Sequence, residues 1–441
     1  MTNVADRSMG LALRSINKMA GSDTLDRLRL RGPVEKALRR GTRDGFRVIT
    51  VAGGAFQAPA KRSGKDGARL EPTAPSGLFD LTPTEEQQML VEAASAFAEE
   101  RLRPAAAAAE RELAPAALLS EATELGLAML GVPESAGGAV SERSAVTGAL
   151  VTEALAYGDP GLTVLLLAPA AVATAIAAWG DADQQQQYLP SLLSDEPPVA
   201  ALALAEPRAL ADPLAPATVA TPIAGGYELN GVKALVPRAT DCALLVVGAT
   251  IPGHGPALFL VETSADGVSA HEDDRAMGLH GAWLGRIQLD RVTVSEDALL
   301  AKADPQVYRE CVARSQLAWA AVASGATKAV RDFVAGYVNE RVAFGEPISH
   351  RQAVAFTVSN VAIEHEGLRL VMLRAAARAD AGRDFHREAA LARSLADRHG
   401  SQIGSDGVQL LGGHGYIDEY PVERWYRDLR ACGTLDGIVL I

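Results

Sequence analysis

The spacing of hydrophobic residues changes twice along the chain. From residue 79 to 197, and again from 304 to 441, apolar residues recur at helical spacing. Between residues 198 and 303, short apolar runs alternate with polar positions and are separated by glycine-containing turns. This order predicts an α+β multidomain protein. We expect an N-terminal all-α domain at 79–197, a central small β-barrel-like domain at 198–303 and a C-terminal helical domain at 304–441.

The same pattern places individual elements. The pair Asp304-Pro305 supplies an N-cap and a first-turn proline for a long helix. We expect the N-terminal domain to open with a helix that has Thr82 as its N-cap and Glu85 completing a capping box. The expected long helices are 306–341, 352–381 and 385–411, and the expected strands are 199–205, 226–236, 242–250, 257–263 and 285–294.

One stretch of the N-terminal domain is long enough to cross a membrane. Residues 160–180 are 21 positions without a charged side chain. The stretch also contains Pro160, Pro169 and many alanines, and helices that are apolar on every side occur in the cores of large proteins. We therefore expect a buried helix.

The start of the chain differs in charge from the remainder. Residues 1–76 carry 15 Lys and Arg against 7 Asp and Glu, a net charge of +8, whereas the whole chain has −12. Residues 58–79 are rich in Pro, Gly and Ser, which is typical of a linker. We expect 1–78 to be a basic extension and linker. It either packs on the acidic body or docks, through residues 1–57, on an acidic partner or a membrane surface.

Composition excludes several classes of function. An acidic body does not hold nucleic acid through a general basic field, so we expect no nucleic-acid binding. The three cysteines lack the spacing of a disulfide framework or a zinc site, and we expect no metal. Free thiols fit a reducing compartment, and charges within the first 21 residues argue against a signal peptide. We therefore expect a cytoplasmic protein.

Four segments in a fixed order resemble the acyl-CoA dehydrogenase family. They are ALALAEPRALAD (201–212), LNGVKALVP (229–237), RVAFGEPISHRQ (341–352) and VQLLGGHGYIDEYPVERWYRDLR (408–430). The resemblance covers roughly residues 79–441. It implies a C-terminal four-helix bundle, an FAD cofactor, and α,β-dehydrogenation of an acyl-CoA substrate to a trans-2-enoyl-CoA in fatty acid metabolism. It also implies an electron-transfer flavoprotein as partner.

The resemblance further implies a flavin site shared between subunits. Arg341, Phe344 and Gln352 correspond to residues that contact the FAD of a neighbouring subunit, and so do Gln409 and Gly413. An arginine fork suits a pyrophosphate. Without the resemblance, a surface arginine favoured by the helix dipole would explain Arg341 as well. A shared site implies an oligomer, either a homodimer or a tetramer, and a heteromer is also open.

The predicted flavin-ring contacts depart from the family pattern. The family's threonine beside the ring is Ala205, so only backbone donors around Leu204 and Ala205 remain. The family's tryptophan over the ring is Leu235, and the nearby Thr or Ser is Pro237. Each lost hydrogen bond weakens flavin binding by about 1 kcal/mol.

The resemblance assigns the catalytic base to Asp436. The family commonly has a glutamate at this position, nine residues after the Arg of an RD pair, here Arg427-Asp428. Such a carboxylate removes the substrate's α-proton. The other base position of the family holds Ser315, which closes that route. Two other functions remain open: a non-catalytic or heteromeric partner subunit, and a nitroalkane-oxidase-like or acyl-CoA-oxidase-like flavoenzyme.

Overall fold

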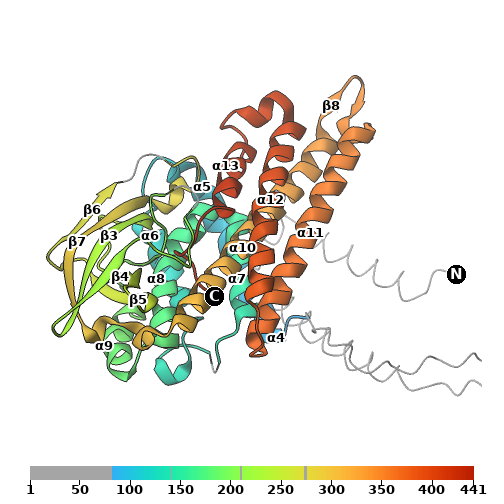
Figure 1. The fold of residues 1–441 in the computed structure, drawn as a ribbon. Coiled ribbons are helices and arrows are strands. Elements are labelled where there is room, and N and C mark those ends of the chain that lie inside the picture. The colour runs from blue at the N-terminus through green and yellow to red at the C-terminus, as the bar shows by residue number, and fades with distance from the viewer. Residues whose placement is uncertain (1–81, 141, 209–210, 273–275) are drawn as a thin grey trace, which may run out of the picture. The chain divides into compact units, whose positions relative to one another are not determined.

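The computed structural model describes residues 82–140, 142–208, 211–272 and 276–441. Within these residues, helices are followed by a sheet and then by longer helices, so the predicted α+β order is confirmed (Figure 1). The basic extension expected at 1–78, with its docking surface at 1–57, lies outside the described residues.

Six α-helices lie in the part of the N-terminal domain that the structure describes. The first begins at Glu85, and its N-cap is Thr84, which exchanges side-chain and backbone hydrogen bonds with Gln87. The predicted N-cap at Thr82 was therefore two residues too early, because Gln87 rather than Glu85 closes the capping box. The helices are α4 (Glu85–Phe97), α5 (Arg103–Ala109), α6 (Ala116–Glu124), α7 (Ala145–Gly158), α8 (Pro160–Trp179) and α9 (Ala182–Leu192).

Helix α8 is the uncharged stretch identified in the sequence. Among the described residues it is the one helix long and apolar enough to cross a membrane, and 72% of its most apolar window is buried inside the protein. Asp159 caps its first turn through a hydrogen bond from the Leu162 amide to Oδ1 (2.8 Å). The burial agrees with the expected core helix.

The described residues of the central domain form one seven-stranded sheet. Its order is β1-β4-β2-β3-β7-β6, with β5 paired to β4. Strand β1 runs parallel to β4, whereas β3 and β7 are antiparallel and change register between Lys233 and Val236. The strands are β1 (Ala200–Ala203), β2 (Val219–Ile223), β3 (Gly226–Pro237), β4 (Leu244–Ile251), β5 (Gly255–Glu262), β6 (Val268–Glu272) and β7 (Leu284–Ser295).

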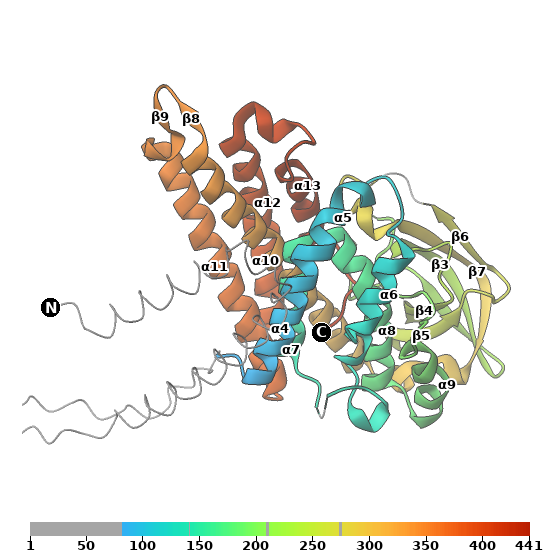
Figure 2. The same cartoon turned by 180° about the vertical axis from the view of Figure 1, so that it is seen from behind.

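The C-terminal domain is a bundle of four helices, which are α10 (Pro305–Glu340), α11 (Gln352–Asp380), α12 (His386–Leu411) and α13 (Val422–Cys432). A short hairpin of β8 (Val342–Ala343) and β9 (Glu346–Pro347) joins the first two. Small residues let α10 pack closely on α7: a Cβ added at Gly325 would lie 2.2 Å from the Glu153 carbonyl oxygen. Helices α7 and α8 lie between the bundle and the sheet (Figure 2).

All three cysteines of the sequence are buried. Cys242 lies in the core of the sheet domain, Cys311 between α10 and the sheet, and Cys432 at the end of α13. Burial raises the pKa of all three thiols, that of Cys242 to about 12.

Candidate active site

The hairpin after α10 presents three of the predicted dinucleotide contacts. The Arg341 amide closes the helix by donating to the Tyr337 carbonyl (2.8 Å). Phe344 and Gly345 then form a two-residue turn with φ of 58° and 88°, both in the left-handed region. Phe344 is 95% exposed, and Arg341 and Gln352 are exposed as well. The structure therefore places these three residues together on the surface.

The other two dinucleotide contacts lie at the same end of the bundle. Gln409 is exposed in the last turn of α12, and Gly413 follows in a short turn where an added Cβ would meet no atom within 4 Å. The His414 ring nitrogen Nδ1 forms a hydrogen bond with the Tyr337 hydroxyl (2.9 Å), which ties this turn to the end of α10. All five predicted contacts thus share one solvent-facing end of the bundle (Figure 1).

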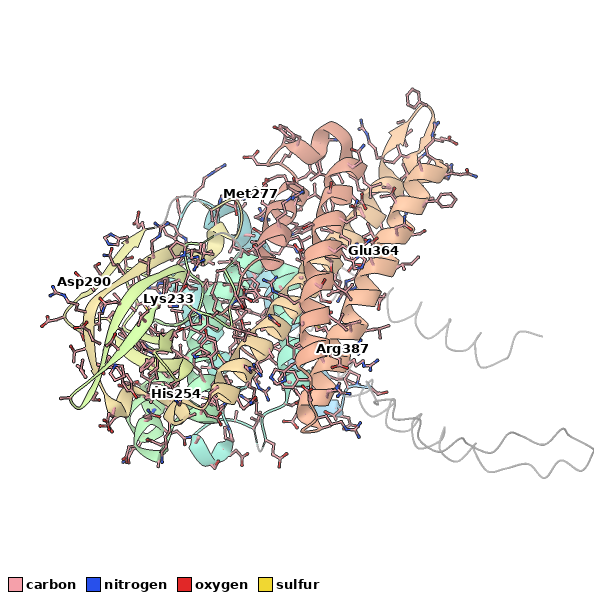
Figure 3. All side chains as sticks on the ribbon, in the orientation of Figure 1. Lys233, His254, Met277, Asp290, Glu364 and Arg387 are labelled. Carbon is pink, nitrogen blue, oxygen red and sulfur yellow. The ribbon has the colours of Figure 1, made fainter. Side chains whose placement is uncertain are left out.

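The end of β1 is held by a buried ion pair. Lys233 Nζ donates to Glu206 Oε1 (2.8 Å) and to the Leu204 carbonyl (3.3 Å), and the Lys233 side chain has no exposure. Thr218 donates to Glu206 through both its amide and its hydroxyl (2.8 and 2.6 Å). Figure 3 places Lys233 on the strands of the sheet domain. The pair fixes Leu204 and Ala205, which are the predicted ring contacts, relative to β3.

This ion pair changes the pKa of both partners. Burial lowers the pKa of Lys233 to about 8, although Glu206 opposes the change. Burial acts to raise the pKa of Glu206, but the charge of Lys233 and hydrogen bonds from Lys233 and Thr218 outweigh it and lower the pKa to about 2. The pair is therefore ionised at neutral pH.

Leu235 and Pro237 lie at the irregular end of β3. Leu235 has a φ of 58° within the register shift, which is unfavourable for a non-glycine residue. Its side chain packs against the helical core cluster that includes Ile438 and Val439. Pro237 pairs with Leu284 and lines a cavity. The position that holds a tryptophan in the family is therefore filled here by aliphatic packing.

Asp436 lies in a largely buried position beside Arg393. Its side chain is 18% exposed, and Oδ1 is buried without a hydrogen-bond partner, 3.8 Å from Nη2 of Arg393. Burial raises the pKa of Asp436 and the negative charge of Asp212 raises it further, while Arg393 opposes both. A carboxylate suits the role of general base when its pKa is raised and one of its oxygens has no hydrogen-bond partner.

The two base positions of the family are neighbours in this structure. Ser315 Oγ accepts from the Gly437 amide (2.8 Å) and donates to the Gly437 carbonyl (3.0 Å). The Trp319 indole also donates to that carbonyl (3.0 Å). Ser315 carries no basic group, so Asp436 is the one carboxylate at either position.

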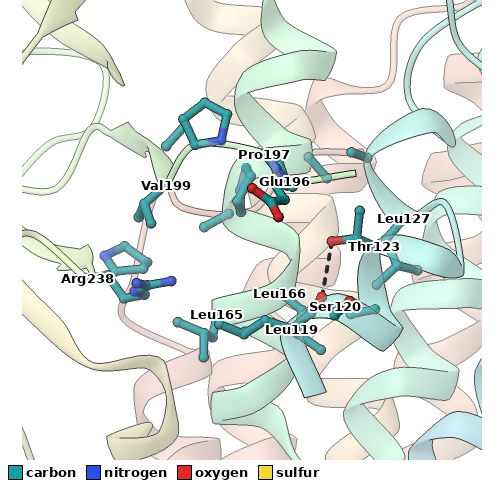
Figure 4. Close-up of a pocket in the computed structure, with 18 of the residues that line it drawn as sticks. Leu119, Ser120, Thr123, Leu127, Leu165, Leu166, Glu196, Pro197, Val199 and Arg238 are labelled. Atoms are coloured by element: carbon teal, nitrogen blue, oxygen red, sulfur yellow. Dashed lines mark hydrogen bonds between the residues drawn. The ribbon is translucent and has the colours of Figure 1, made fainter. Parts of the chain in front are cut away.

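Two cavities lie between the sheet and the N-terminal helices. The smaller, about 350 Å³, lies between α6, α8 and the approach to β1, and its lining is mainly apolar, with Leu119, Leu165 and Val199 (Figure 4). The larger, about 820 Å³, is lined by charged groups including Arg111. Arg238 borders both cavities. Neither cavity is lined by Leu204, Ala205, Leu235 or Asp436.

Sequence reasoning missed the groups that support these residues. The Glu206–Lys233 pair was not predicted, although a lysine inside the apolar run of β3 is a signal of a buried partner. Arg393 was missed as the cation beside Asp436, because 43 residues separate them and no pattern connects α12 with the end of the chain. The hydrogen bond from Trp319 to the Gly437 carbonyl was missed as well, because 118 residues separate the two.

The two ends of the predicted flavin site differ in how exposed they are. The dinucleotide end is open, and an exposed arginine beside exposed backbone suits a pyrophosphate. At the ring end, the Ile438 amide donates to the Leu202 carbonyl (2.9 Å), and a Cβ added at Gly437 would lie 3.1 Å from the Leu204 amide nitrogen. Residues 437 and 438 therefore lie directly beside the backbone of Leu204 at the ring end.

Comparison with known proteins identifies three matching domain families. The acyl-CoA dehydrogenase N-terminal domain matches residues 84–196, the middle domain matches 201–292, and the C-terminal domain matches 306–438. An acyl-CoA dehydrogenase of Bacillus subtilis (strain 168) is 29% identical over 363 residues, which cover 80% of this chain and 95% of that protein.

Solved structures share the fold. Butyryl-CoA dehydrogenase from Megasphaera elsdenii has a TM-score of 0.73 and 26% identity, and covers 80% of this chain and 95% of that one. A structure described as the electron transferring flavoprotein of Acidaminococcus fermentans has a TM-score of 0.73 and 28% identity, with 81% and 95% covered. The fold of these solved structures and the order of the three matching domains therefore point to the same family.

Proposed function

For a chain that belongs to the acyl-CoA dehydrogenase family of FAD-dependent oxidoreductases, we propose α,β-dehydrogenation of an acyl-CoA thioester to a trans-2-enoyl-CoA. The observation that carries the proposal is the environment of Asp436, a partly buried carboxylate with a free oxygen and a raised pKa. FAD contributes the acceptor for two electrons in this family.

Asp436 takes the α-proton in this proposal. The α C–H group beside a thioester carbonyl is only a weak acid. The base that removes its proton must therefore be more basic than a solvated carboxylate. Burial supplies that basicity, and Asp212 adds to it through charge repulsion. The positive charge of Arg393 opposes this rise of the pKa.

The experiment is Asp436→Asn, with flavin reduction by acyl-CoAs followed anaerobically. We expect the rate to fall at least ~10²-fold, the lower range for loss of a general base, with little change in binding of a substrate analogue. Asp212→Asn is the matched control: it removes a like charge, so the acid limb of the pH–rate profile should move to lower pH while the plateau rate is kept. An Asp436→Asn variant that reduces flavin as fast as the parent would falsify the assignment.

We also propose a second copy of the chain as partner. Phe356, Ile363 and Leu370 recur every seven residues along α11 and are 63%, 69% and 53% exposed. Such a stripe is typical of a helix that packs on another protein. The exposed Arg341 end of the bundle adjoins this helix, which supports a shared dinucleotide site. Light scattering at micromolar concentration tests the oligomer, and a fully loaded monomer would contradict the shared site.

The acceptor of the electrons is proposed to be an electron-transfer flavoprotein. Support comes from the similarity to the flavoprotein structure from Acidaminococcus fermentans. Reduction of a dye-coupled electron-transfer flavoprotein by this chain and an acyl-CoA tests the proposal. A cytoplasmic location and the lack of nucleic-acid binding stay predictions from charge and composition.

A further inference from the structure

The turn that leads from α13 to Asp436 packs closely against α12. It comprises residues 432–435 and begins at the last residue of α13. A Cβ added at Gly433 would lie 2.5 Å from the Cα of Asp397 on α12, so the turn has no room for a side chain at that point. The position of Asp436 therefore depends on how α12 holds this turn.

Arg393, one helical turn before Asp397, binds both ends of the turn. Its Nη1 donates to the Cys432 carbonyl (2.9 Å) and its Nη2 donates to the Leu435 carbonyl (2.8 Å). The Leu435 carbonyl belongs to the peptide group that joins this residue to Asp436. A planar guanidinium presents its donors in fixed directions, so the two bonds fix the orientation of that peptide group as well as its place.

The guanidinium of Arg393 uses its donors for the main chain rather than for a carboxylate. Its side chain is 12% exposed, and Nη2 lies 3.8 Å from Asp436 Oδ1, which is too far for a hydrogen bond. A buried arginine whose role is to neutralise a neighbouring carboxylate would form the bidentate pair that its fork allows. The geometry here matches a clamp on the backbone instead.

We propose that Arg393 is a positioning residue for the candidate base: its two hydrogen bonds to the turn set the direction in which the carboxylate of Asp436 is presented. The inference deepens the proposed function and rests on it for the effect on the rate. A base must meet the α C–H group in the right geometry, so a displaced turn slows proton transfer even when the pKa is unchanged. The arrangement also leaves Asp436 Oδ1 without a hydrogen bond, as a base requires.

The charge of Arg393 acts on Asp436 as well, and substitutions can separate the two effects. Other titratable groups around the pair come from α10, α12, α13 and the loop after β1, and they are Tyr308, Asp397, Cys432 and Asp212. Arg393→Lys keeps the positive charge, but an ammonium does not reproduce the planar fork that binds both carbonyls. Arg393→Met removes the fork and the charge together.

The rate of anaerobic flavin reduction by an acyl-CoA, measured as a function of pH, tests the proposal. Arg393→Lys should lower the plateau rate at least ~10-fold, as expected for loss of a charged hydrogen bond, and should leave the acid limb in place. Arg393→Met should lower the plateau as much and move the acid limb to higher pH, because loss of the positive charge raises the pKa of Asp436. Binding of a substrate analogue should stay within ~2-fold in both variants, because the contacts removed are with the turn.

Arg378→Lys is the matched control. Arg378 Nε donates to the Asp384 carbonyl (2.7 Å) in the loop between α11 and α12, so this substitution also removes a bond from an arginine to the main chain. Its plateau rate should stay within ~2-fold of the parent. An Arg393→Lys variant with the parent's plateau rate overturns the proposal, and so does an equal loss in Arg378→Lys, since the loss would then not be specific to the turn.

Hydrogen exchange measures the hold on the turn without turnover. The Leu435 amide donates to the Ala431 carbonyl (3.1 Å), so its exchange reports on opening of the turn. Arg393→Lys should speed this exchange at least ~10-fold, and Arg378→Lys should leave it unchanged. Unchanged exchange in Arg393→Lys overturns the proposal.

The two proposals fail in different ways. An Asp436→Asn variant that reduces flavin as fast as the parent overturns the proposed function, and exchange of the Leu435 amide then still decides whether Arg393 holds the turn. An enzyme that oxidises an acyl-CoA at the same rate and exchanges this amide equally slowly after Arg393→Lys keeps the proposed function and overturns the positioning role.

Discussion

The ion pair between Lys233 and Glu206 allows the sharpest prediction about stability. Lys233→Met removes the ammonium but keeps most of the side-chain volume, so it isolates the electrostatic contribution. Glu206 keeps three donors, from the Ala217 amide and from the amide and hydroxyl of Thr218. The Leu204 carbonyl loses its lysine donor.

The size of the effect follows from these contacts. Breaking a buried ion pair costs about 3–5 kcal/mol, because one charge is left uncompensated. The three remaining donors to Glu206 place this case at the lower end, about 3 kcal/mol. At roughly 2 °C per kcal/mol for a body of this size, the melting temperature should fall by about 6 °C. Thermal unfolding followed by circular dichroism at pH 7 measures it.

The double variant Glu206→Gln/Lys233→Met is the internal control. With both charges removed, the glutamine oxygen still accepts from Thr218, so the double variant should recover at least ~1 kcal/mol relative to Lys233→Met. A single variant that melts within 1 °C of the parent, or a double variant less stable than the single one, would refute the reasoning.

Three further predictions concern cofactor, pH and assembly. Arg341→Ala should raise the Kd for FAD at least ~10-fold, as expected for loss of a charged hydrogen bond, and calorimetry that finds equal affinity contradicts the contact. Burial raises the pKa of Asp159 to about 6, opposed by Arg424, so the folded state binds a proton more tightly than the unfolded chain and stability falls as pH rises from 4 to 6. Asp159→Asn should flatten this slope in urea titrations, while a persisting slope would assign it to another group. Ile363→Asp should shift the oligomer to monomers in light scattering, and an unchanged mass would exclude this face of α11.

Long elements could be predicted from the sequence because their signals are local. The helix expected at 306–341 is Pro305–Glu340, since Asp304 caps it and Arg341 begins the hairpin. Strands β2 and β6 were not predicted, because they are largely exposed and lack an alternating pattern: in β2 only Ala220 is buried. Their place in the sheet comes from pairing with β3 and β7, which no local window contains.

The candidate site was predictable in its residues but not in its arrangement. The resemblance placed Asp436 at the base position, and the structure shows a partly buried carboxylate there. Where the chain goes after Asp436 depends on contacts with Leu202, Ser315 and α7, all more than 100 residues away. The apolar run from Ile438 to Ile441 indicates burial, but no sequence pattern states which groove it fills.

The burial of all three cysteines makes this chain convenient for site-specific labelling. Their raised thiol pKa values leave little thiolate at neutral pH, and the surrounding core blocks reagents of maleimide size. A cysteine introduced at the exposed Thr434, two residues before Asp436, would be the first reactive thiol among the described residues and in the whole sequence. A single fluorophore there can report on the surroundings of Asp436, without first replacing any native thiol.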